Sequence, residues 1–258
     1  MASLRGAVST LRVLGLRLTM MEALRRIINK TYEIDGVAIN NSTTFRIIRM
    51  IRARGWSVVR DGEWYLLKAN FGIVASRDLW LFREVAVQPD YGPVRGRVLD
   101  VGAYLGETAV KFARNGADYV VAYEPVYSDA CAKTLELNGV RGECRPHGVW
   151  WREGELSIGG FGAGAGGVLG NFKIRVVALG DVLREGFDVA KLDCEGCEYA
   201  ILTLPCEIIS SVPRWIVEIH GPETPIVYKF VECGFKPLKK ADLAQYVSIY
   251  EFVKEQKP

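Results

Sequence analysis

The chain has 258 residues, of which 49% are hydrophobic and 24% charged, a composition typical of a globular protein with one large domain or a domain plus a small extension. No apolar run reaches the roughly 20 uncharged residues that a membrane-spanning helix needs. Because no secretory signal is recognised either, we expect a cytoplasmic protein.

The net charge of +3 is divided unevenly along the chain. Residues 1–60 hold 11 Lys/Arg and 3 Asp/Glu, whereas the remainder holds 22 Lys/Arg and 27 Asp/Glu. A basic end on a mildly acidic body suggests an anionic partner, either a membrane surface or a nucleic acid. A solvated basic face without a partner is the alternative.

The first 92 residues predict a basic α+β extension. Residues 4–28 repeat apolar side chains at helical spacing among five arginines, which predicts an amphipathic helix or two helices broken near Gly15. This segment could make peripheral contact with an anionic membrane, or its apolar stripe could cover the main domain. A second helix over Phe45 to Ala53 and a hairpin turning at Asp61-Gly62 follow, and then a further strand and a helix.

Residues 97–108 predict a nucleotide-type cradle. A short buried strand leads through Gly102 and Gly106 into a helix over Thr108 to Arg114, whose N-terminus offers free N–H groups and the positive end of a dipole. The dinucleotide pattern G-x-G-x-x-G needs a glycine where the pyrophosphate touches the backbone. Tyr104 occupies that place here, so the spacing argues against NAD.

The next buried strand, Tyr119 to Tyr123, ends in Glu124-Pro125. An acidic residue about 20 positions after the glycines can accept hydrogen bonds from a ribose. The cradle and Glu124 together fit S-adenosyl-L-methionine (SAM), with the carboxylate of its amino-acid tail near the helix start and Glu124 on the ribose hydroxyls. The alternative is an ordinary α/β turn with an incidental glutamate.

From Arg97 onward strands and helices alternate, which predicts a parallel, doubly wound sheet. Two predicted strands, 188–192 and 215–220, end in polar side chains. Ligands bind at the carboxyl ends of such strands, and like charges repel in a cleft unless they are used. We therefore expect a functional site there, while for the histidine a purely structural role is the alternative. The residues at these strand ends are Asp193, Glu195, Glu198, Glu218 and His220.

Six cysteines are scattered along the chain, and this distribution does not imply a disulfide scaffold. Cys194 and Cys197 form a C-x-x-C pair, but zinc would need a second pair. The chain has only three glutamines, a thermophile signature that would make intracellular disulfides possible. The glycine-rich segment 159–170 predicts either a lid or a disordered loop.

Four segments together resemble FkbM-type SAM-dependent methyltransferases: residues 98–108, Glu124-Pro125, Lys191 to Glu198, and Val217 to His220. The K-x-D-x-E-G-x-E segment is the most specific of them, and the resemblance spans roughly residues 80–253. It implies an α/β, Rossmann-like class I methyltransferase fold with a seven-stranded, mostly parallel sheet and a C-terminal antiparallel hairpin. It also implies SAM as cofactor and O-methylation of a hydroxyl on a sugar, lipid-linked glycan or other small-molecule acceptor.

On this basis we expect residues 1–92 to form the N-terminal helical and hairpin extension and residues 93–258 to form the SAM-binding methyltransferase domain. Cys194 and Cys197 depart from the family pattern, since small or apolar residues are more usual there, and so does the long basic extension.

A hydroxyl is a poor nucleophile, so a general base or a metal helps it to react. We expect Asp193 closest to the methyl group and the acceptor, with Glu195, Glu218 and His220 as base or acceptor-binding groups. The same four side chains could hold a divalent metal, but no metal site is assigned from the sequence. The residues expected to contact SAM are Asp100, Gly102, Ala103, Tyr104, Gly106, Thr108, Glu124, Pro125, His147 and Asp193.

Two other functions fit parts of this pattern. An RNA methyltransferase would share the cradle and grip phosphates with the basic residues of the extension, although no RNA-binding module or Asn-Pro-Pro-Tyr-type segment is present. A non-catalytic SAM-binding or membrane-docked protein would share the fold, but the intact carboxylate cluster argues against it.

Overall fold

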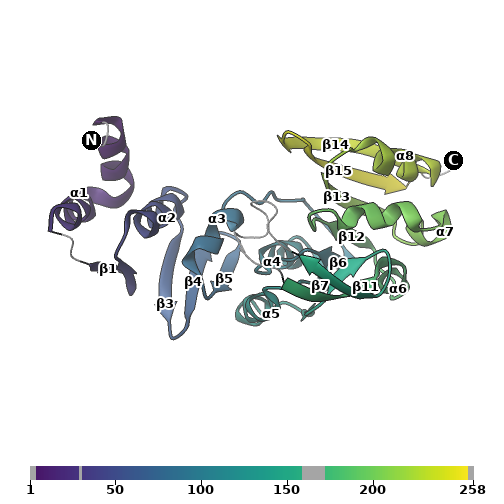
Figure 1. Ribbon diagram of the computed structural model, residues 1–258, viewed down its shortest axis with the longest axis horizontal. Helices are drawn as coiled ribbons and strands as arrows, with labels where there is room; N and C mark the ends of the chain where they lie inside the picture. The colour runs from purple at the N-terminus through teal and green to yellow at the C-terminus, as the bar shows by residue number, and fades with distance from the viewer. Residues whose placement is uncertain (1–3, 29–30, 159–171, 255–258) are drawn as a thin grey trace. The chain divides into compact units, whose positions relative to one another are not determined.

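The computed structural model describes residues 4–28, 31–158 and 172–254, so the predicted glycine-rich lid or loop over 159–170 lies outside the described residues. The chain forms two compact units, residues 1–88 and 89–258 (Figure 1). In the described part of the chain, no helix is long and apolar enough to cross a membrane.

The first unit combines helices with two small antiparallel sheets, β1-β2 and β3-β4-β5. α1 bends at Gly15, where φ is 76°, which confirms the predicted break. The hairpin β1-β2 was not predicted, because strands of three residues are too short to show a period. The elements are α1 (Leu4–Ile28), β1 (Tyr32–Ile34), β2 (Val37–Ile39), α2 (Ser42–Ala53), β3 (Ser57–Asp61), β4 (Trp64–Ala69), β5 (Gly72–Ser76), the 3-10 helix η1 (Leu79–Leu81) and α3 (Phe82–Val85).

The second unit is built on a seven-stranded sheet of order β14-β15-β13-β12-β6-β7-β8. The five strands from β13 to β8 are parallel, and β15 runs antiparallel to both of its neighbours, which confirms the predicted fold class. The strands of this sheet are β6 (Gly96–Val101), β7 (Ala117–Tyr123), β8 (Gly142–Arg145), β12 (Val189–Leu192), β13 (Arg214–His220), β14 (Phe235–Ala244) and β15 (Val247–Lys254).

The second unit also contains a separate three-stranded sheet of order β10-β11-β9. Its strand β9 was not predicted, since it has only three residues. The remaining elements of the second unit are α4 (Glu107–Arg114), α5 (Ser128–Leu137), β9 (Gly148–Trp150), β10 (Gly154–Ile158), β11 (Phe172–Ala178), α6 (Leu179–Leu183), η2 (Cys197–Thr203), α7 (Cys206–Ile209) and α8 (Thr224–Glu232).

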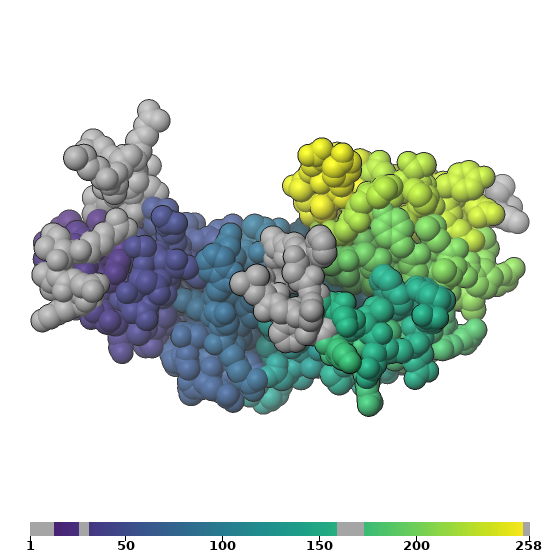
Figure 2. Space-filling model, viewed as in Figure 1, coloured from purple at the N-terminus to yellow at the C-terminus, as the bar shows by residue number. Residues whose placement is uncertain are grey.

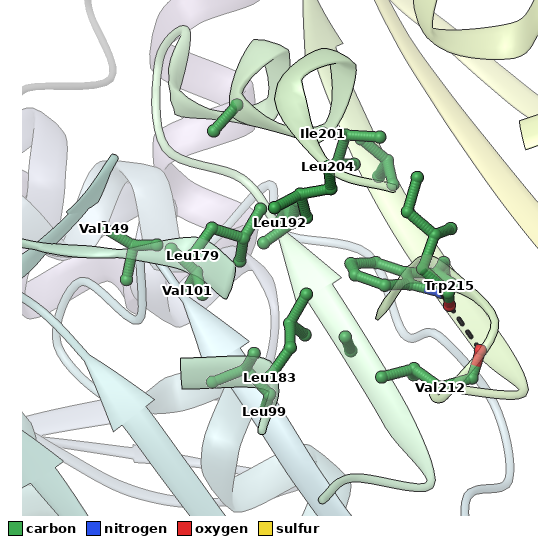
Figure 3. Packing of buried hydrophobic residues seen from close by; sticks show 14 of the residues in the cluster. Leu99, Val101, Val149, Leu179, Leu183, Leu192, Ile201, Leu204, Val212 and Trp215 are labelled. Carbon is green, nitrogen blue, oxygen red and sulfur yellow. Dashed lines mark hydrogen bonds between the residues drawn. The ribbon is translucent and has the colours of Figure 1, made fainter. Parts of the chain in front are cut away.

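Alternate residues of the central strands enter two separate cores. Leu99 and Val101 join the larger core with Trp215, whose indole N–H donates to the carbonyl of Val212 at 3.1 Å (Figure 3). Val98 points to the opposite face and packs with residues of α4 and α5. The teal, green and yellow segments of the second unit lie against one another on the face that Figure 2 shows. Asp100, two residues after Val98 in β6, is fully buried.

All six cysteines are paired in disulfides, an arrangement that their distribution along the sequence did not imply. The bonded pairs have Cα–Cα separations of 5.0 to 6.0 Å, and for Cys131–Cys144 and Cys206–Cys233 this proximity is created by folding and is not revealed by the cysteine spacing. Two bonds join separate elements and the third closes the loop after β12. The pairs are Cys131–Cys144, Cys194–Cys197 and Cys206–Cys233.

Candidate functional site

Lys191 links the two ends of the predicted site. It lies opposite Asp100 in the parallel pair β12–β6, and its Nζ is 3.0 Å from Asp100 Oδ1 and 3.3 Å from Asp193 Oδ2. The same ammonium donates to the carbonyl of Gly102 at 3.0 Å. Burial lowers the pKa of Lys191, but the charges of the two aspartates outweigh it and hold the pKa well above its usual value. Lys191 thus joins the glycine cradle to the acidic loop, a role that sequence reasoning missed.

The polar side chains at the ends of β12 and β13 meet around His220. Its Nε2 lies 3.5 Å from Glu218 Oε1 and 3.7 Å from Glu195 Oε1. Its Nδ1 lies 3.2 Å from Glu198 Oε1. The structure therefore brings together the side chains that sequence analysis placed at the two strand ends.

Glu198 orients His220, although the sequence suggested no particular role for it. The carboxylate is fully buried and accepts hydrogen bonds from the backbone N–H of His220 at 2.8 Å and of Gly196 at 2.9 Å. Sequence analysis placed Glu198 among the acidic residues of the loop but could not show that it faces the histidine of another strand. It ties the loop after β12 to the end of β13.

The cluster shifts the pKa values of its members. Burial lowers the pKa of His220, but hydrogen bonds to Glu198 and Glu218 and the charge of Glu195 raise it to about 11. At neutral pH this imidazole is therefore protonated and donates hydrogen bonds. Burial raises the pKa of Glu195, with the charge of His220 opposing that shift.

Two buried polar atoms near this cluster have no hydrogen-bond partner among the described residues: Glu218 Oε2 and the hydroxyl of Tyr91. Tyr91 precedes β6, stacks on Phe112 with ring centroids 5.9 Å apart, and interacts electrostatically with Lys191 and Asp193. Burial raises its pKa. Sequence reasoning missed Tyr91, since nothing in its local pattern indicates that it faces strand ends far along the chain.

The predicted cradle has little free space around its glycines. Gly102 has φ +77°, and a Cβ there would overlap the carbonyl oxygen of Asp193. Gly106 has φ +86°, and a Cβ there would lie 3.1 Å from the carbonyl oxygen of Cys131 on α5. Between them, Tyr104 adopts φ 51°, which is uncommon for a residue with a side chain. The turn thus holds the acidic loop and α5 close to the start of α4, where Thr108 and the neighbouring Ala103 are buried.

Glu124 closes the other side of the cradle. One carboxylate oxygen accepts from the backbone N–H of Tyr104 at 3.0 Å, and the other accepts from Val126 at 2.7 Å and Tyr127 at 3.0 Å, spanning the turn at Pro125. Burial raises the pKa of this carboxyl group, and the three N–H donors oppose that shift. These hydrogen bonds show that Glu124 fixes the cradle to the end of β7, a structural role that does not depend on a ligand.

His147 lies beside Glu124 at the carboxyl ends of β7 and β8, since the backbone N–H groups of both residues donate to the carbonyl of Arg145. It follows β8, and its backbone N–H donates to the carbonyl of Arg145 at 2.8 Å. Within the described residues its side chain forms no hydrogen bond or ion pair with another predicted site residue. Its contact with SAM stays a prediction.

Within the described part of the chain, two groups of side chains have ligand atoms close enough to share a metal ion. Asp193, Glu218 and His220 each offer one atom, and the three atoms lie within 4.8 Å of one another. Cys194, Cys197 and Glu198 form the other group, but the two sulfurs are joined in a disulfide and are not available as thiolates. The first group is thus the better candidate for a cation.

A cavity of about 330 Å³ begins directly after His220 in the chain. Residues 221–224 line one side, and the β14–β15 hairpin lines the rest with Lys239, Asp242, Tyr246 and Ser248. Glu223 accepts hydrogen bonds from Lys239 at 3.0 Å and Ser248 at 2.9 Å across this cavity. The lining is rich in groups that hydrogen-bond to hydroxyls.

Comparison with solved structures finds 226 similar chains. They include a ribosomal protein L11 methylase from Lactobacillus delbrueckii subsp. bulgaricus, at 17% identity over 69% of this chain and 78% of the other, with a TM-score of 0.37. Aeropyrum pernix fibrillarin, in complex with SAM, shows 11% identity over 76% and 98%, with a TM-score of 0.40. An O-methyltransferase family protein from Burkholderia thailandensis shows 11% identity over 63% and 52%, with a TM-score of 0.40.

Among curated proteins, no sequence matches this chain significantly. The family described as the methyltransferase FkbM domain matches residues 100–237, more than half of the chain. The match begins at Asp100 and includes the glycine cradle, Glu124, the acidic loop and the end of β13. The chain therefore belongs to the FkbM family of methyltransferases, with SAM as its methyl donor.

Proposed function

We propose that this methyltransferase acts on a hydroxyl oxygen of a sugar, a lipid-linked glycan or another small-molecule acceptor. The observation that supports this most directly is the group of carboxylates at the ends of β12 and β13, in which Glu218 Oε2 is buried without a hydrogen-bond partner among the residues that the structure describes. A hydroxyl acceptor brings a proton that must be removed, and carboxylates can accept it.

The cradle fits SAM on its own geometry. Gly102 and Gly106 adopt positive φ values, and the space that a Cβ would need is occupied by the acidic loop and by α5, so this tight turn favours glycine at both positions. The first N–H groups of α4 lack partners within their helix, which suits the carboxylate of the cofactor's amino-acid tail. Glu124 sits at the end of β7, where its oxygens can also accept hydrogen bonds from ribose hydroxyls.

On the acceptor side, bound SAM supplies a methyl group carried on a positively charged sulfur. Asp193, which Lys191 holds at the end of β12, lies nearest the reacting atoms in this proposal. The Glu195 side chain is 44% exposed and so is open to an entering acceptor. Glu195 would accept the hydrogen bond of the acceptor hydroxyl and take its proton as the methyl group passes from the sulfur to the oxygen, breaking the S–C bond and leaving S-adenosylhomocysteine. His220, whose Nε2 lies 3.5 Å from Glu218 and 3.7 Å from Glu195, would hold both carboxylates in place.

The cavity beside β13 supports a polar acceptor. Lys239, Asp242, Tyr246 and Ser248 offer donors and acceptors together with one aromatic ring, a combination suited to a sugar.

The first experiment is calorimetric titration of S-adenosylhomocysteine into the wild type, Glu124→Ala and Glu124→Gln, with Glu232→Gln on α8 as a surface control. We expect micromolar binding by the wild type and the control, and a loss of about tenfold or more in both Glu124 variants, since hydrogen bonds to a charged group are lost. Transfer of labelled methyl groups to glycans, lipids and RNA, abolished by Asp193→Asn, then identifies the acceptor. Absence of binding by folded wild-type protein would refute the assigned cofactor.

A second candidate is methylation of RNA, which the first unit favours. Residues 1–88 hold 14 Lys/Arg and 7 Asp/Glu. Arginines lie over aromatic rings at short distances, with Arg60 4.3 Å from Tyr65 and Arg83 4.1 Å from Trp80, and such pairs also suit stacked bases. Filter binding of RNA at varied salt tests this: sub-micromolar affinity with a steep salt dependence would support it, and weak binding at all salt concentrations would exclude it.

A further inference from the structure

We infer that Asp193, Glu218 and His220 form a binding site for a divalent cation of the Mn²⁺ or Mg²⁺ class, and that this cation holds the acceptor hydroxyl. The inference rests on the proposed function for the role of the cation, whereas cation binding itself can be measured without an acceptor. One ligand atom from each residue lies within 4.8 Å of the others, a spacing compatible with a shared ion.

The unused oxygen of Glu218 is the observation that points to a ligand. Glu218 is 7% exposed, its Oε1 faces His220, and its Oε2 is buried with no hydrogen-bond partner among the described residues. Leaving a buried carboxylate oxygen unpaired is costly, so such an atom indicates a group that binds there. A cation satisfies both the charge and the lone pairs of this oxygen.

His220 is oriented as a metal-binding histidine would be. Glu198, fully buried, faces Nδ1 at 3.2 Å, which leaves Nε2 directed at Glu218 and Glu195. A carboxylate on one ring nitrogen with the metal on the other is the usual arrangement around histidine ligands. A proton and a cation compete for Nε2, because the same carboxylates attract both.

Asp193 supplies the third ligand and has one oxygen to spare. Lys191 engages Oδ2 at 3.3 Å, so Oδ1 is the oxygen available to a cation. Four carboxylates lie around this space, those of Asp193, Glu195, Glu198 and Glu218, and Lys191 is the only lysine or arginine with which any of them forms an ion pair in the described residues. The local excess of negative charge favours a dication.

The donor set indicates which cation binds and what it does. Two carboxylates and one imidazole suit a borderline or hard divalent ion and leave coordination positions for other oxygens. An acceptor hydroxyl in one of those positions would be held next to Glu195, and the cation would stabilise its oxygen as the proton leaves. The site would thereby select acceptors that present a hydroxyl. An acceptor with a second oxygen next to that hydroxyl would bind more tightly, because both oxygens could contact the cation.

The test uses Mn²⁺ as the probe. The full chain is stripped with EDTA, dialysed and titrated with Mn²⁺, and the free ion is followed by electron paramagnetic resonance. We expect one Mn²⁺ per chain and a loss of affinity of at least about tenfold in Asp193→Asn, Glu218→Gln and His220→Gln, with about a 10–100-fold loss in Glu198→Gln through the orientation of His220. Glu232→Gln removes a carboxylate elsewhere on the chain and should bind as the wild type does.

Glu218→Asp is a control for misfolding, because it keeps the charge at this position while its shorter side chain moves the carboxylate oxygens away from the site. Thermal unfolding of every variant shows whether it is folded. Absence of Mn²⁺ binding, or binding unchanged in all three ligand variants, would overturn the inference. A parallel titration with S-adenosylhomocysteine separates the two proposals. If only S-adenosylhomocysteine binds, the cation site is wrong and the methyltransferase function stands. If only Mn²⁺ binds, the cation site stands and the methyltransferase function fails. If neither binds, both proposals fail.

Discussion

Lys191 Nζ lies 3.0 Å from Asp100 Oδ1, and both side chains are enclosed, with Lys191 1% exposed and Asp100 fully buried. The two residues are direct neighbours in the parallel pair of β12 and β6, although they are far apart in the sequence. The lysine of the acidic motif therefore compensates the aspartate that begins the glycine cradle. A buried ion pair of this kind does not by itself indicate high stability, but breaking it leaves an uncompensated charge.

Replacing Lys191 with Met should thus destabilise the protein by about 3–5 kcal/mol, because the carboxylate of Asp100 stays buried without its counter-charge. Apart from this contact with Lys191, the oxygens of Asp100 have no hydrogen-bond partner among the described residues, so no other group compensates the charge. Urea unfolding at pH 7 measures the loss. The double variant Lys191→Met/Asp100→Asn should recover at least half of this loss. If the stability loss of the double variant equalled the sum of the losses of the two single variants, the pairing would be contradicted.

Replacing Gly102 with Ala should destabilise the cradle by more than the usual free-energy cost of an alanine with a positive φ. A Cβ at this position would overlap the carbonyl oxygen of Asp193, which is backbone and cannot rotate away. Gly186 is a matched control, since its φ of +80° is close to the +77° of Gly102 and no atom lies within 4 Å of its Cβ position. We expect Gly186→Ala to cost about 1–2 kcal/mol of stability, and Gly102→Ala to cost more and to abolish S-adenosylhomocysteine binding. If Gly102→Ala lost no more stability than Gly186→Ala, the positive φ alone, and not the contact with Asp193, would account for the glycine at position 102.

Much of the fold follows from local patterns. The apolar run of β6, the break at Gly15 in α1 and the glutamate after β7 are each visible within a few residues, and the structure has them where the sequence places them. The strand-end residues could also be predicted to meet, because Asp193 and His220 end neighbouring parallel strands. Periodicity and the rules of parallel sheets are sufficient for these features.

What the sequence does not reveal depends on tertiary contacts. Lys191 would pass for an ordinary polar residue until the register of β12 against β6 is known. Tyr91 lies before the first strand of its sheet, and only folding encloses its hydroxyl. The Cys131–Cys144 bond joins α5 to β8, a proximity that no spacing rule for cysteines encodes. In each case the partner is chosen by packing between segments, and a single sequence carries no direct signal of it.

Replacing Glu107 with Gln should stabilise the protein at alkaline pH and leave it unchanged in acid. Glu107 is 1% exposed, and burial raises its pKa from 4.5 to about 7, with the charge of Lys111 opposing the shift. The unfolded chain gives up this proton near pH 4.5 and the folded chain near pH 7, so the wild type loses stability relative to the variant between these values. Above pH 8 the difference should reach about 3 kcal/mol.

Thermal and urea unfolding of both proteins at pH 4 and pH 8.5 measure this difference. Gln has nearly the same shape as the protonated carboxyl group, so the two proteins should be equally stable at pH 4. A stabilisation independent of pH would mean that side-chain packing is responsible, and destabilisation at pH 8.5 would mean that the ionised carboxylate is needed at this position.

The three disulfides should contribute unequally to stability. In the chain-entropy account, a crosslink stabilises more when it closes a longer loop, and the sequence separations here are 27, 13 and 3 residues. Paired replacement by alanine should therefore cost about 3.5 kcal/mol for Cys206–Cys233, about 3 for Cys131–Cys144 and about 1.5 for Cys194–Cys197. Denaturant unfolding of the three double variants measures the order, and a thiol assay on the denatured wild type should find no free thiol before reduction and six after it. If the Cys194–Cys197 variant proved the least stable, the short loop that carries Glu195 would depend on its disulfide for native geometry, not for loop entropy.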